Sequence, residues 1–161
     1  MKIIKSIVAF LIVSLHYNVK AQSDDYAKTT LLYDDHIYTS NIKTVRFYFD
    51  GWETGFPALR LNSDEKLNFG FDDFDSDYKT YNYTVVHCDA SWNPTNITPS
   101  DYIEGYNEDQ ISDIKRSFNT IQQYTHYHLI MPTNVLKIIK SGNYILKVFL
   151  NIRLFQNYIV S

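Results

Sequence analysis

Alternation of aromatic and β-branched residues over positions 81–88 constrains the fold of this chain more than any other segment. One face of an extended segment here carries Tyr81, Tyr83, Val85 and His87. The opposite face carries Asn82, Thr84, Val86 and Cys88. A period of two with these residue types predicts a β-strand packed on one or both faces.

The predicted strand leads into a long polar loop over residues 89–106. Turn-forming residues surround Trp92, and Asn93 and Pro94 follow it directly. A large aromatic side chain among turn formers is costly to leave in water. We therefore expect this loop to pack against another part of the protein or against a partner.

Other strand signals recur at short intervals, and no segment has a convincing helical period. Residues 135–140 are long enough for one helical turn at most, and Pro57 restricts segment 57–61 to a sheet edge. The remaining strand signals cover residues 30–33, 36–38, 43–49, 67–71, 111–121, 124–131 and 143–149. The spacing predicts an all-β fold, an immunoglobulin-like or fibronectin-like antiparallel β-sandwich of about seven or eight strands.

The last clear strand begins at Gly142, with Tyr144 near its start. A tyrosine at this position of immunoglobulin-like domains hydrogen-bonds back to a nearby loop. We expect Tyr144 to have that structural role, with Gly142 beside it.

The first 21 residues have the pattern of a secretory signal peptide. Lys2 and Lys5 precede a short apolar run, and Ala21 ends a small-residue cleavage site. We expect one β-sandwich domain over residues 22–161. Residues 1–21 contain three Lys and no Asp or Glu, so their removal takes the net charge from −3 to −6. This charge makes nucleic acid a poor candidate partner.

Reactive side chains occur in three short groups, and each has a structural alternative that we favour. His87, Cys88 and Asp89 are the residue types of a cysteine hydrolase, but neighbours in a strand point to opposite faces. Cys88 is the only cysteine, and we expect it to be a small core residue.

The other two groups, three aspartates and two histidines, contain residue types that bind metal ions. Asp73, Asp75 and Asp77 have the spacing that opens a calcium loop, yet later positions lack the required Gly and Glu, so an acidic turn is favoured. His126 and His128 share one face of a predicted strand, but two ligands do not make a zinc site. We predict no metal and no cofactor.

Several motifs resemble the N-terminal domain of the type IX secretion system plug protein family. They are His87-Cys88-Asp89, Trp92-Asn93-Pro94, Asp101 to Tyr106, Asp50 to Glu53, Phe56-Pro57, Leu67 to Asp77, Tyr124 to Tyr127 and Ser141 to Val148. The resemblance covers the chain up to Phe149 and implies the first part of a longer architecture. After Phe149 we expect a departure from the family pattern, explained by a frameshift or an early stop, with a last strand that is missing or atypical.

The resemblance implies a non-enzymatic periplasmic protein that closes an outer-membrane translocon barrel and is peripheral to the membrane. Within the loop 89–106, we expect Trp92, Asn93, Tyr102 and Tyr106 to contact that partner. The alternative is an exported carbohydrate-binding or adhesion module that uses Trp52, Trp92 and exposed tyrosines. Aromatic residues at strand spacing are more often part of the core, and we favour that interpretation.

Overall fold

The computed structural model describes residues 34–152 and 155–160 of the chain, and side chains as far as residue 150. The predicted signal peptide lies outside these residues. Ten strands and one 3₁₀ turn follow one another along the described chain. They are β1 (Ile42–Phe49), β2 (Leu67–Asp73), β3 (Tyr81–Cys88), η1 (Pro99–Asp101), β4 (Ile103–Gly105), β5 (Asp109–Gln110), β6 (Asp113–Arg116), β7 (Thr125–Met131), β8 (Leu136–Ile138), β9 (Asn143–Ile152) and β10 (Phe155–Val160).

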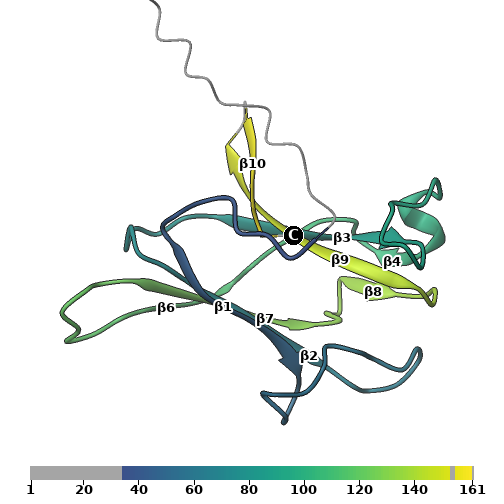
Figure 1. The fold of residues 1–161 in the computed structure, drawn as a ribbon, viewed down its shortest axis with the longest axis horizontal. Helices are drawn as coiled ribbons and strands as arrows, with labels where there is room; N and C mark the ends of the chain where they lie inside the picture. The colour runs from purple at the N-terminus through teal and green to yellow at the C-terminus, as the bar shows by residue number, and fades with distance from the viewer. Residues whose placement is uncertain (1–33, 153–154, 161) are drawn as a thin grey trace, which may run out of the picture.

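The strands form two antiparallel four-stranded sheets, which confirms the predicted all-β sandwich (Figure 1). One sheet has the order β1-β2-β7-β6, and the other has the order β10-β9-β3-β5. The chain crosses between the sheets at Ile111 and Ser112, which separate β5 from β6. A short β4-β8 ribbon lies at the end of the molecule opposite the β6-β7 turn (Figure 1).

Aromatic side chains from both sheets meet in the core. Phe71 of β2 stacks on Tyr127 of β7 with ring centroids 5.1 Å apart, and Tyr81 of β3 meets Tyr127 edge to face at 4.6 Å. All three rings are almost fully buried. Large rings in offset and edge-to-face contact bury much apolar area per residue, so the core can form without disulfides.

The alternation over residues 81–88 is confirmed. The four residues of the expected inner face of β3 are buried, and β3 pairs with β9 along its whole length. Leu67, Phe69 and Phe71 form the buried face of β2, also as predicted. A side-chain period of two thus identified the two strands whose faces meet in the core.

Four predicted elements differ in the structure, and the predicted strand 30–33 lies outside the described residues. Residues 36–38 belong to none of the ten strands. Segment 57–61 forms no strand, and the predicted strand 111–121 is reduced to β6 after the crossover at Ile111. Residues 135–140 form no helical turn, because Leu136 to Ile138 pair with β4 as strand β8. For β8, backbone pairing between segments distant in sequence overrides the weak local preference.

A last strand is present after β9. Strand β10 pairs antiparallel with β9, and its register shifts between Tyr158 and Val160. This shift agrees with the irregular apolar pattern of residues 151–161, which predicts an atypical last strand.

Asp73 is a structural residue at the end of β2. Its carboxylate accepts hydrogen bonds from Asn41 Nδ2 at 2.7 Å, Tyr81 Oη at 2.7 Å and the Asp75 amide at 3.0 Å, and it pairs with Lys79 Nζ at 2.8 Å. The carboxylate therefore links the β2-β3 turn to the core.

Candidate functional site

The loop 89–106 leaves β3 through a turn organised by Asp89. One carboxylate oxygen accepts hydrogen bonds from the amides of Ser91 at 2.8 Å and Asn93 at 3.0 Å. These backbone donors hold the pKa of Asp89 below its usual value. The turn places Trp92 in a left-handed conformation with φ near 62°, so its exposed ring is held by an ordered backbone.

Tyr102 anchors the far part of the loop to the sandwich. Its ring is 6% exposed and lies against the rings of His87 and Tyr144, with centroids 5.6 Å and 5.9 Å away. Its hydroxyl donates to the Val85 carbonyl at 3.4 Å. The prediction of Tyr102 as a contact residue is therefore corrected, because its burial removes the ring from the surface.

The predicted contact residues Trp92, Asn93 and Tyr106 are exposed, Trp92 by 46% and Tyr106 by 70%. Tyr106 is held next to the β4-β8 ribbon by a bond from its amide to the Val135 carbonyl at 2.7 Å. Residues 89–108 contain four carboxylates and no Lys, Arg or His. The loop thus presents exposed aromatic side chains beside carboxylates, one of which, Glu104, lies 3.7 Å from Lys137 Nζ of β8.

The predicted structural residues lie beneath this loop. The Tyr144 hydroxyl donates to the Lys140 carbonyl at 2.6 Å, which is the type of bond expected of it. Gly142 lies against the ring of His87, and any side chain there would collide with that ring. Cys88 is buried, and burial raises the pKa of its thiol, so it lacks the features of a nucleophile.

A row of hydrogen-bonded polar side chains crosses the outer face of the β1-β2-β7-β6 sheet. Asn68 donates to Asp50 Oδ1 at 2.6 Å, and its carbonyl oxygen lies 2.9 Å from His128 Nε2. The other ring nitrogen of His128 lies 3.0 Å from Asp113 Oδ2. Each ring nitrogen of His128 therefore lies within hydrogen-bonding distance of a side-chain oxygen.

His126 lies on the same face, as predicted, and its Nδ1 lies 2.7 Å from Asp72 Oδ1. The rings of His126 and His128 have centroids 6.4 Å apart. Within the described residues, no group of three or more His, Cys, Asp or Glu side chains could hold a metal ion.

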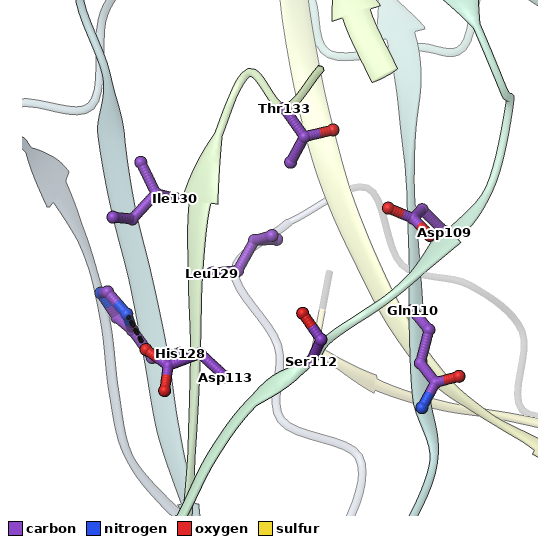
Figure 2. A pocket seen from close by; sticks show the side chains of 8 residues that line it. All are labelled: Asp109, Gln110, Ser112, Asp113, His128, Leu129, Ile130 and Thr133. Carbon is purple, nitrogen blue, oxygen red and sulfur yellow. Dashed lines mark hydrogen bonds and ion pairs between the residues drawn. The ribbon is translucent and has the colours of Figure 1, made fainter. Parts of the chain in front are cut away.

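A pocket of about 240 Å³ opens where the chain crosses from β5 to β6 (Figure 2). Its walls come from the ends of β5, β6 and β7 and from the segment after β7. The lining residues are Asp109, Gln110, Ser112, Asp113, His128, Leu129, Ile130 and Thr133. Sequence reasoning missed this pocket, because no motif marks it and only the sheet topology brings these segments together.

The aromatic residues divide between core and surface. Tyr81, Tyr83 and Tyr127 are buried, as the favoured interpretation predicts. The same interpretation is wrong for the two tryptophans, because Trp52 is 63% exposed in the β1-β2 connection and Trp92 lies on the loop described above.

A family model described as the type 9 secretion system plug protein 1st domain matches residues 42–160. The chain belongs to this family. The match continues past Phe149, so the expected departure of the chain from the family pattern at that point is not observed. A crystal structure of a hypothetical protein from Parabacteroides merdae ATCC 43184 is similar, with a TM-score of 0.73 and 28% sequence identity.

That similarity covers 81% of this chain and 34% of the Parabacteroides chain, so this plug-family domain spans about a third of that relative's length. No curated protein matches the chain. In the part of the chain that the structure describes, no helix is long and apolar enough to cross a membrane.

Proposed function

We propose that this plug-family domain is exported to the periplasm, where it acts without catalysis to close an outer-membrane translocon of type IX secretion. The family match carries this proposal. Because fold and family alone leave the contact surface open, the surface has to be argued from the residues.

The loop 89–106 is the surface we propose for the translocon contact. Trp92 and Tyr106 are exposed, yet the Asp89 turn and buried Tyr102 hold the loop in one conformation. Exposed aromatic residues on an ordered backbone lose little conformational entropy on binding and are enriched at interfaces.

No constellation in the described residues supports a reaction. Cys88 is buried, and the nearest histidine in sequence, His87, makes its contacts with Thr95 and the Ser141 carbonyl. A nucleophile and a base within hydrogen-bonding distance are the usual signature of covalent catalysis. We therefore propose a binding role.

Co-purification with the translocon barrel tests this function. A tagged chain should bring a large outer-membrane barrel with it from gently solubilised outer membranes. A photo-crosslinking residue in place of Trp92 or Tyr106 should attach to the barrel, whereas one in place of Lys43, an exposed residue of β1, should not. A folded chain that brings no barrel from those membranes would contradict the proposal.

The exposure of Trp52 and Trp92 also supports a second candidate, a carbohydrate-binding module. Sugar rings stack on exposed aromatic faces, so glycan binding would quench tryptophan fluorescence. Saturable quenching by soluble outer-membrane glycan, abolished by Trp92→Ala, would favour this candidate over translocon closure.

A further inference from the structure

Strand β7 has a free edge over its last three residues. It pairs with β2 along its whole length, from Thr125 to Met131. On its other side it pairs with β6, and that ladder stops at His128, opposite Asp113. Within the described residues, no strand pairs with Leu129 to Met131 on this side.

The pocket at the β5-β6 crossover lies on this free edge. His128, Leu129 and Ile130 all line it (Figure 2). Successive side chains of a strand point to opposite faces of the sheet. Three consecutive residues can therefore share one pocket only where it wraps around the edge of the strand. The pocket occupies the place that a longer β6 would fill.

Several polar groups at this edge are open to solvent and available to a ligand. Ser112 and Gln110 are exposed, and among the described residues no hydrogen bond within the protein engages the Ser112 hydroxyl or the Gln110 side-chain amide. The Tyr83 hydroxyl lies 3.3 Å from Asp109 Oδ2 and 3.2 Å from the Thr133 hydroxyl oxygen, and the Thr133 hydroxyl can itself donate to Tyr83. A ligand with backbone and side-chain donors could satisfy these groups.

Charge and size indicate what the pocket can accept. Two carboxylates line it, and no Lys or Arg does. Asp113 pairs with His128 and lies 3.6 Å from Lys115, whereas within the described residues the Asp109 carboxylate has only the long bond from Tyr83. A volume of about 240 Å³ is below the roughly 300–1,000 Å³ of small-molecule pockets. It suits a single side chain.

We propose that this pocket binds an extended peptide segment of a partner protein. The segment adds to the free edge of β7 in line with β6 and antiparallel to β7, and it directs one basic side chain toward Asp109. Main-chain pairing supplies affinity in this mode of recognition, and the pocket selects the side chain. This site is independent of the translocon contact proposed for loop 89–106.

A short synthetic peptide tests the proposal on the intact mature chain. The probe is acetyl-Thr-Val-Lys-Val-Thr-amide, followed by amide NMR shifts of the isotope-labelled protein. We expect saturable shifts at Ser112 and at Leu129 to Met131. Replacing the peptide's Lys by Gln should weaken binding roughly five- to tenfold, because a charge-assisted contact is lost.

Two further comparisons separate strand addition from simple cation binding. N-methylation of the peptide's central amides should abolish binding, since it removes the main-chain donors. Asp109→Asn should weaken binding of the Lys peptide but not of the Gln peptide, whereas Asp77→Asn, in an exposed turn residue, should change neither. The Asn variant keeps the side-chain shape, so correct folding can be verified from its unchanged spectrum.

Three results would overturn the proposal. The first is an absence of saturable shifts at Leu129 to Met131 at millimolar peptide. The second is equal binding of the N-methylated peptide, which would show that the β7 edge is not used. The third is a set of shifts confined to residues 89–106, which would place peptide binding on the other surface.

Discussion

At the scale of single residues, Asp73 shows how one buried charge can organise a turn. Its side chain is fully buried, and its partners come from three places: Asn41 before β1, Tyr81 in β3 and Lys79 in the β2-β3 turn. A buried carboxylate is tolerated only when its acceptor sites are filled. The acidic turn is therefore part of the core and not a spare cation site.

Removal of this carboxylate should destabilise the domain strongly. Asp73→Ala leaves the buried Tyr81 hydroxyl and the Lys79 ammonium without their partner. We expect a loss of about 3 kcal/mol in the free energy of unfolding, measured by urea denaturation. Asp77→Ala, in the same turn but exposed, should stay within about 0.5 kcal/mol of the wild type. Equal losses in the two variants would show that Asp73 has no special role.

The same residue predicts a pH dependence. Burial of the Asp73 carboxyl opposes ionisation, but hydrogen bonds from Lys79, Tyr81 and Asn41 outweigh it and hold the pKa below its usual value. An unfolded Asp has a pKa of about 3.9. A depressed pKa in the folded state means that this stabilisation is complete above that value and is lost as the pH falls through the folded pKa.

Urea denaturation between neutral pH and about pH 3 measures this effect. The Asp73→Asn variant cannot ionise at that position, so its stability should fall less steeply with acid than that of the wild type. Parallel curves for the two proteins would mean that Asp73 does not contribute to acid unfolding.

At the scale of elements, the β4-β8 ribbon depends on one glycine. Gly105 has φ near 103°, and a Cβ at this position would overlap the Val135 backbone carbonyl. Gly51 also has a positive φ, near 77°, but a Cβ there would meet nothing within 4 Å. Substitution of Gly51 therefore measures the cost of backbone strain alone, and substitution of Gly105 measures strain together with a steric collision.

We expect Gly51→Ala to cost about 1 kcal/mol from strain alone. Gly105→Ala should cost clearly more, because a backbone carbonyl cannot move aside without breaking the pairing of Gly105 with Leu136. Hydrogen exchange should show faster exchange in β4 and β8, with β3 and β9 protected as before. Equal costs for the two variants would argue against a tight ribbon.

Strands were predicted well where apolar and polar residues alternate because one face is buried. They were predicted poorly where a strand forms only because it pairs with a distant segment. Residues 81–88 and 67–71 carry their own pattern, so β3 and the buried face of β2 were predicted correctly. Strand β8 has three residues and exists because β4 pairs with it, which no local preference could reveal. The pocket follows from where β6 stops along β7, and the register of a pair is not visible in either strand alone.

The candidate contact loop was predicted in part for a similar reason. A large aromatic residue in a polar loop was expected to pack on something, and Tyr102 does so. Trp92 was the residue expected to pack in this way, but it is exposed in the structure. An aromatic residue among turn formers indicated that the loop packs against something, but only the three-dimensional path of the loop determined which ring does so.

At the scale of the whole molecule, one core joins both sheets, and both tryptophans lie outside it. The buried cluster includes residues from β2, β3, β7 and β9, so neither sheet has a hydrophobic core of its own. A domain of this size with a single core should unfold in one cooperative step. Near-ultraviolet circular dichroism of the buried tyrosines and far-ultraviolet signal from the strands should give the same urea midpoint.

Tryptophan fluorescence should report this transition poorly. Trp52 and Trp92 are 63% and 46% exposed in the folded domain, so unfolding changes their surroundings little. We expect a small change in emission across the transition in which the tyrosine signal is lost. A large blue-shifted emission from the folded chain would mean that a tryptophan is buried against another surface. The single core also decides how the circular dichroism results are interpreted. Different urea midpoints for the near-ultraviolet and far-ultraviolet signals would mean that the two sheets can unfold independently, which contradicts a core shared by both sheets.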